Sequence, residues 1–262
     1  MSLKIGITER GDAGINLTWE DKLNQVDGAI LITKNITEEF SEALLRQHNN
    51  GFPIILHATC TGWGNSHFEP NVPTPTEQLT AAYRLLERGF PLKQLVLRID
   101  PIIPTTVGMR RFSEVLQIAN EIGIPSKTVR KRVSILDQYP HVKERLKTIG
   151  YNPLYNGYFQ AAPWTIEGVA KTLDRIYDQW GKYAVGFESC AEPMLAEKAH
   201  SVTASGCVSA KDIELMGLDI NQIPAGVNRQ NRSGCLCCTA KQELLTQRGR
   251  CANGCIYCYW KG

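Results

Sequence analysis

Three cysteines near the end of the chain have the spacing of a metal-binding loop. Cys251, Cys255 and Cys258 form a CxxxCxxC pattern that includes Gly254. Three thiolates on one short loop can each bind one iron of a [4Fe–4S] cluster and leave the fourth iron open to another ligand. Gly254 suits a loop whose backbone folds closely around a cluster. The pattern predicts a cluster with one iron that the protein does not hold.

A second group of cysteines lies upstream and leaves the choice of metal open. Five thiols could supply a second cluster, and these are Cys190, Cys207, Cys235, Cys237 and Cys238. The Cys235 group could instead form a zinc site with the last three cysteines, because structural zinc prefers closely spaced cysteine pairs. If one of these thiols took the fourth iron, the protein would be a structural or redox iron–sulfur protein. Buried cysteine without metal is the remaining interpretation.

Composition narrows the classes of protein. Of the 262 residues 43% are hydrophobic, which is enough for a folded core, and a net charge of +3 permits nucleic acid as a partner without requiring it. No apolar run has the length of a membrane span or a secretory signal, so we expect no membrane partner and a cytoplasmic location. Thiols stay reduced there, which makes nine cysteines a poor disulfide framework. We expect a monomer.

Short apolar runs alternate with amphipathic stretches, which is typical of βα units in an α/β fold. The predicted strands span residues 3–8, 29–33, 54–59, 94–100, 132–136 and 183–188. The predicted helices span residues 38–48, 75–88, 110–122, 166–180 and 240–247. Thr74 and Glu77 form a capping-box pattern with Pro75 at the first helical position.

Several segments resemble one known class of enzymes. The tail RCANGCIYCYWKG, with Tyr257 before its last cysteine, resembles the cluster loop of spore photoproduct lyase and other radical S-adenosylmethionine (SAM) enzymes. Residues 32–34, 56–70 and 97–104 resemble three strands of that lyase and the turns after them. In such enzymes SAM binds the open iron, and an electron from the cluster splits SAM to a 5′-deoxyadenosyl radical. The resemblance implies a [4Fe–4S] cluster, SAM and a reductant such as flavodoxin or ferredoxin.

The order of the segments differs from that in the lyase, because the cluster loop comes last here. This order is similar to that of an uncharacterised family, the domain of unknown function 1848. The similarity implies a full or partial TIM-like β/α barrel of radical SAM type with permuted order. We expect residues 1–190 to form the barrel core and residues 191–262 to form a cysteine-rich segment that carries the cluster loop.

The resemblance also suggests which residues contact SAM. Lys34 follows its strand as the lysine that contacts the SAM carboxylate does, and Glu69 could hold a ribose hydroxyl or anchor a loop. Thr59 and Thr61 could hydrogen-bond SAM or the substrate, or simply pack. Catalytic groups lie at the carboxyl ends of strands in α/β barrels, so we expect these side chains to meet.

Other candidates carry two interpretations each. Asp100 could act on the substrate or form a buried ion pair with Arg98. Cys60 could return a hydrogen atom to a product radical, although a small buried residue is the better interpretation. Glu188 could bind the SAM amino group or hold the loop. Tyr257 completes the expected cofactor contacts.

The substrate is the least defined part. Lys127 and the run 130–132 are basic, and three tryptophans could stack on bases: Trp63, Trp164 and Trp260. Basic residues with nearby aromatic rings suit phosphate contacts and a flipped base. With the lyase resemblance, this favours a lyase or isomerase that acts on a modified thymine of DNA. A small metabolite, a peptide, or a zinc-bearing nucleic-acid-binding module remain alternatives.

Overall fold

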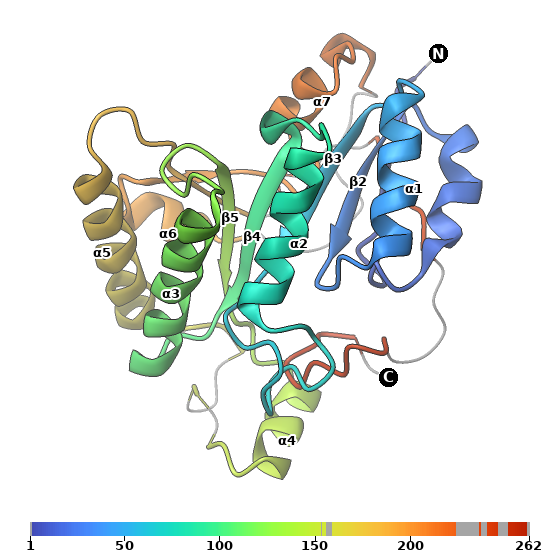
Figure 1. Ribbon diagram of the computed structural model, residues 1–262. Helices are drawn as coiled ribbons and strands as arrows, with labels where there is room; N and C mark the ends of the chain where they lie inside the picture. The colour runs from blue at the N-terminus through green and yellow to red at the C-terminus, as the bar shows by residue number, and fades with distance from the viewer. Residues whose placement is uncertain are drawn as a thin grey trace.

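A computed structural model describes residues 2–152, 154–155, 159–223, 236, 240–245 and 251–260. Its centre is one sheet of eight parallel strands in the order β7-β6-β5-β4-β3-β2-β1-β8 (Figure 1). The strands are β1 (Ile5–Ile7), β2 (Gly28–Thr33), β3 (Ile54–Thr59), β4 (Leu95–Ile102), β5 (Arg130–Ile135), β6 (Phe187–Ser189), β7 (Val202–Ala204) and β8 (Lys241–Glu243). This is the order of strands around a β/α barrel. Within the described residues no ladder joins β7 to β8.

Helices cover one face of the sheet. They are α1 (Glu38–Asn49), α2 (Pro75–Glu87), α3 (Thr106–Ile122), α5 (Pro163–Trp180) and α6 (Pro193–Lys198). Two 3-10 helices belong to the same layer, η1 (Leu17–Gln25) and η2 (Leu92–Gln94). The main core lies between this layer and the strands, with Phe40, Leu44 and Phe112 fully buried. The capping box of Thr74 and Glu77 is formed as predicted.

The second face of the sheet carries its own apolar cluster. Ile5, Ile30 and Ile55 pack there against the region around Cys207 and Ile213. That region includes α7 (Ala210–Leu215) and is followed by η3 (Ile220–Gln222). Figure 1 places α7 beside the amino ends of the central strands. Both faces of the sheet are therefore buried, as in other parallel sheets.

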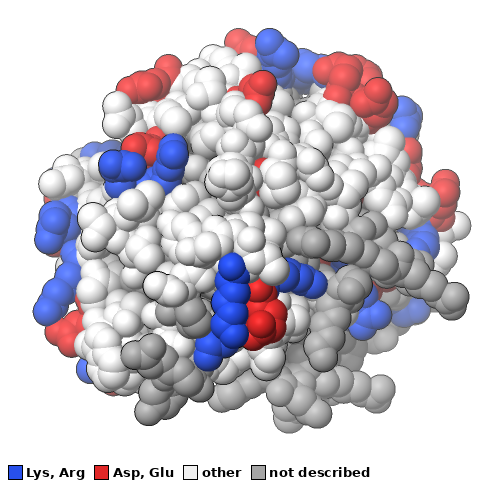
Figure 2. Space-filling view, turned by 90° about the horizontal axis from the view of Figure 1, so that it is seen from below, with Lys and Arg blue, Asp and Glu red and all other residues white. Residues whose placement is uncertain are grey.

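The carboxyl ends of the strands point to the opposite side, and we call this side the carboxyl edge. Figure 1 shows α4 (Pro140–Thr148) and the C-terminal loop below that edge. Seen from this side in Figure 2, much of the described surface is uncharged and the basic side chains stand in small groups. No helix in the described residues is long and apolar enough to cross a membrane.

Five of the six predicted strands and four of the five predicted helices are confirmed, most with shifted ends. The strand predicted at residues 183–188 is mostly wrong, because β6 begins only at Phe187. The helix predicted at residues 240–247 is wrong, because residues 241–243 form β8 and pair with β1. The predicted surface role of the basic run is also wrong. Arg130, Lys131 and Arg132 belong to β5 and are 5%, 0% and 0% exposed, so they cannot lie along a phosphate backbone.

Candidate site at the carboxyl edge of the sheet

The cysteine loop is folded by its own backbone. The Gly254 amide donates to the carbonyl of Cys251 at 3.1 Å, and the Cys258 amide donates to that of Cys255 at 3.2 Å. Gly254 has φ of +65°, a left-handed conformation that glycine adopts without strain. Arg145 of α4 donates to the carbonyl of Cys258 at 2.8 Å. Cys255 is buried, whereas Cys251 and Cys258 are half-buried.

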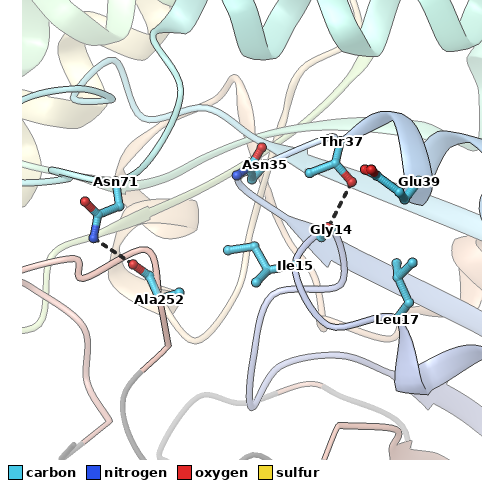
Figure 3. A pocket seen from close by; sticks show the side chains of 8 residues that line it. All are labelled: Gly14, Ile15, Leu17, Asn35, Thr37, Glu39, Asn71 and Ala252. Atoms are coloured by element: carbon cyan, nitrogen blue, oxygen red, sulfur yellow. Dashed lines mark hydrogen bonds between the residues drawn. The ribbon is translucent and has the colours of Figure 1, made fainter.

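The segment that follows β3 holds this loop against the sheet. The amide of Ile256 donates to the carbonyl of Phe68 at 2.9 Å, and the Asn71 side chain donates to the carbonyl of Ala252 at 2.8 Å. Figure 3 shows the second bond at one side of a shallow pocket of about 470 Å³. The pocket is lined by Gly14, Ile15, Leu17, Asn35, Thr37, Glu39, Asn71 and Ala252. The loop is thus part of the folded edge.

Asp12 joins the ends of two strands to the loop. Its buried carboxylate accepts from the Thr33 hydroxyl at 2.5 Å, from the Lys34 amide at 2.7 Å and from the Asn253 side chain at 2.6 Å. Burial raises the pKa of Asp12, and these donors act against the rise. Sequence reasoning missed both Asp12 and Asn253. The only sequence signal was the run Asp12-Ala13-Gly14, which is typical of a turn. In the structure the Gly14 amide donates to the Asp12 carboxylate at 2.9 Å.

Lys34, Glu69 and Tyr257 meet beside Cys255. The Lys34 ammonium lies 2.6 Å from Glu69 and 2.9 Å from the Tyr257 hydroxyl, and that hydroxyl also donates to Glu69. Thr61 donates to the other Glu69 oxygen at 2.7 Å. Burial works against the charge of Lys34, but the Glu69 carboxylate outweighs it and raises the pKa of Lys34. Four predicted site residues therefore form one network, in which Glu69 anchors the loop.

The thiols of the loop lie close enough to affect one another. Burial raises the pKa of Cys255 to about 12, while nearby Lys34 acts against the rise and the other two sulfurs add to it. Burial also raises the pKa of Cys251. A metal cation would convert such thiols to the thiolates that bind iron. Three soft sulfur donors on one short loop fit an iron–sulfur cluster.

Arg98, Asp100 and Ser134 form a second polar group at the edge. The Arg98 guanidinium donates to Asp100 at 2.6 Å, and Ser134 donates to the other oxygen of that carboxylate. Burial opposes the Asp100 charge, yet Arg98 holds the pKa of Asp100 below its usual value. Among the described residues, the buried Thr59 hydroxyl has no hydrogen-bond partner. Cys60 packs in the main core with the helix layer, as a small buried residue does.

Glu188 is held by arginines of the neighbouring strand. It accepts from Arg130 at 3.0 Å and from Arg132 at 2.6 Å, and Arg130 also lies 2.8 Å from Asp212 of α7. Burial opposes the Glu188 charge, but the arginines lower the pKa of Glu188. This network ties α7 to the second face. A contact of Glu188 with SAM stays a prediction.

Two cysteines of the predicted second cluster lie together. The sulfurs of Cys190 and Cys207 are 3.2 Å apart and buried. Glu9 lies close to Cys207 and pairs with Lys241 of β8. Burial and Cys207 raise the pKa of Glu9 to about 7. The other predicted ligands, Cys235, Cys237 and Cys238, lie outside the described residues.

Comparison with known proteins gives one family. The family model described as a domain of unknown function (DUF1848) matches residues 16–260. The chain belongs to this family. The match includes the C-terminal loop and every residue of the Lys34–Glu69–Tyr257 network of this DUF1848 protein, whereas Asp12 lies just before the matched range. No curated protein matches the chain.

Proposed function

We propose that this DUF1848 protein is a radical SAM enzyme whose fold is a permuted, full or partial β/α barrel. One observation carries the proposal. A loop with three thiols lies at the carboxyl edge of a parallel sheet, and its buried Cys255 adjoins the Lys34–Glu69–Tyr257 network. Enzymes with parallel βα units place their reacting groups at this edge.

The residues divide the work as follows. Cys251, Cys255 and Cys258 would hold a [4Fe–4S] cluster, which when bound supplies the electron that cleaves SAM. Lys34 would bind the SAM carboxylate, because its side chain is only 17% exposed yet the ammonium remains charged beside Glu69. Glu69 and Tyr257 fix the position of that ammonium. A second cluster at Cys190 and Cys207 remains part of the proposal.

The zinc alternative takes its second set of ligands from Cys235, Cys237 and Cys238, which lie outside the described residues. Structural zinc usually takes four ligands from two closely spaced groups, whereas three thiols on one loop can each bind a different iron of a [4Fe–4S] cluster. The spacing of Cys251, Cys255 and Cys258 therefore favours a cluster. A redox protein whose cluster is ligated by a fourth thiol is the second candidate.

We propose a lyase or isomerase reaction on a base such as a modified thymine of DNA. Arg98, Asp100 and Thr59 lie at the same edge as Lys34, and each offers a polar group to a substrate. Because the run at residues 130–132 is buried, phosphate contacts must come from other residues.

The test is SAM cleavage under exclusion of oxygen. Protein reconstituted with iron and sulfide is given dithionite and SAM, and 5′-deoxyadenosine is measured by chromatography together with iron and zinc content. We expect deoxyadenosine from the wild type and none from Cys255→Ala, with matching circular dichroism spectra for the two. Zinc without cleavage would favour the binding module. A reducible cluster that never cleaves SAM would favour the redox protein.

A further inference from the structure

Four aromatic side chains form a row beside the cysteine loop. The ring centres of Phe159 and Tyr139 are 4.3 Å apart, those of Tyr139 and Tyr259 are 6.5 Å apart, and those of Tyr259 and Trp260 are 5.1 Å apart. We call these four residues the aromatic row. Tyr139 directly precedes α4, Phe159 lies between α4 and α5, and Tyr259 and Trp260 directly follow Cys258.

The row lies at the surface although its rings are large and apolar. Phe159 is 39% exposed, Tyr259 is 47% exposed and Trp260 is 40% exposed. Single exposed aromatics are common, but neighbouring rings that stay exposed together usually mark a binding surface. Trp164 and Tyr183 are more exposed, at 73% and 72%, but among the described residues neither makes a ring contact with the row.

Cations flank the row. The Arg10 guanidinium lies 5.6 Å from the centre of the Trp260 ring. Arg145 of α4 donates to the carbonyl of Trp260 at 3.0 Å, which fixes the end of the row against a helix. That helix also carries Lys143 and Lys147, and Lys147 pairs with Glu144 at 2.8 Å. A ligand with flat rings and negative charge matches this surface.

We propose that the aromatic row binds single-stranded nucleic acid, with bases stacked on its rings and phosphates near Arg10 and α4. Unpaired bases expose flat faces to stack, and stacking on aromatic side chains tolerates any sequence. A duplex hides those faces and needs a longer basic surface, whereas the basic side chains in Figure 2 stand in small groups.

The proposal rests on the proposed function in one respect: the row would deliver a base to the same edge that holds the cysteine loop. Tyr259 follows Cys258 directly, and its hydroxyl donates to the carbonyl of Glu9 at 3.3 Å. A strand of nucleic acid bound on the row therefore passes beside the loop. Binding itself needs neither SAM nor cleavage.

The experiment measures binding of a labelled single-stranded oligothymidylate of about 12 nucleotides, a length within the usual site size. Fluorescence anisotropy is recorded without oxygen and without SAM, on protein that contains its metal. Stacking contributes roughly 1–3 kcal/mol for each base, so Tyr259→Ala and Trp260→Ala should each weaken binding roughly 5- to 150-fold. The matched control Tyr183→Ala, which also removes an exposed ring, should change it less than about twofold.

Arg10→Ala gives an independent measurement. It should weaken binding and reduce the dependence of the binding constant on salt by roughly one phosphate contact. Iron content and melting temperature show whether each variant keeps its fold and its loop.

Equal affinity of the wild type and the folded Tyr259→Ala and Trp260→Ala variants would overturn the inference, as would tighter binding of the duplex of the same length. The two proposals fail separately. Deoxyadenosine formation without oligonucleotide binding would leave the radical SAM enzyme and remove the nucleic-acid surface. Binding that depends on the row, without SAM cleavage, would do the reverse.

Discussion

Two buried charged networks differ in how completely their charges are paired. On the second face, Arg132 is fully buried and lies within 3.6 Å of both Glu188 and Asp212. At the carboxyl edge, the Lys34 side chain keeps 17% exposure and pairs with the Glu69 carboxylate at 2.6 Å. A buried cation that lies beside two carboxylates serves the fold, whereas a cation with exposed surface that pairs with one carboxylate can bind a further anion. The number of carboxylate partners and the exposure of the cation therefore distinguish a structural network from a binding site more clearly than the residue types do.

The largest expected effect is on the second face. Arg132→Ala leaves two buried carboxylates short of a partner, which should lower the free energy of unfolding by about 3–5 kcal/mol. Urea denaturation followed by circular dichroism measures this. The control Arg88→Ala removes exposed ion pairs to Glu38 and Glu42 and should lower the free energy of unfolding far less, because water screens exposed pairs. Similar losses in the two variants would mean that the network does not brace the fold.

An intermediate effect is expected at the carboxyl edge, on activity rather than on stability. Glu69→Gln keeps the shape of the side chain but leaves Lys34 without its anionic partner and weakens the bond to Tyr257. Loss of such an orienting partner should slow SAM cleavage roughly 10- to 100-fold. Deoxyadenosine formation per bound iron is the measurement, and Glu20→Gln, which breaks an exposed contact with Arg46, is the control. If cleavage stayed constant while stability fell, Glu69 would be a brace.

The fold was predictable because its strands are short, apolar and β-branched. The run 54–59 matches β3 to the residue. The strand at 130–135 was harder, because Arg130, Lys131 and Arg132 replace apolar residues at its start. Each cation is satisfied by groups that are distant in sequence or by local carbonyls, and the sequence alone does not reveal such partners. The sequence therefore suggested an exposed position for a basic run that is buried.

The candidate site was partly predictable for a related reason. Spacing identified the cysteine loop, since metal ligands on one loop are close in sequence. Resemblance identified Lys34 and Glu69, which lie 35 residues apart. Neither could identify the bond between Asp12 and Asn253, which spans 241 residues. The short β8 was missed because three residues without an apolar pattern form a strand only when β1 is beside them.

The smallest effect is expected at Lys131, which has a third kind of environment. It is a buried lysine whose hydrogen-bond partners, in the part of the chain that the structure describes, are carbonyls and not carboxylates. Its ammonium donates to the carbonyls of Ser126 and Val129 at 2.8 Å each, and burial lowers the pKa of Lys131 to about 7. Above pH 7 the folded protein loses this proton, while the unfolded chain keeps it up to about pH 10. The unfolded state then binds more protons, so the free energy of unfolding should rise by on the order of 1–2 kcal/mol from pH 7 to pH 9.

Urea denaturation at several pH values should show the rise in the wild type and in Lys171→Met, an exposed control, but not in Lys131→Met. If the rise persisted in Lys131→Met, other groups would cause it. The two carbonyls would then be sufficient to keep the buried Lys131 charged.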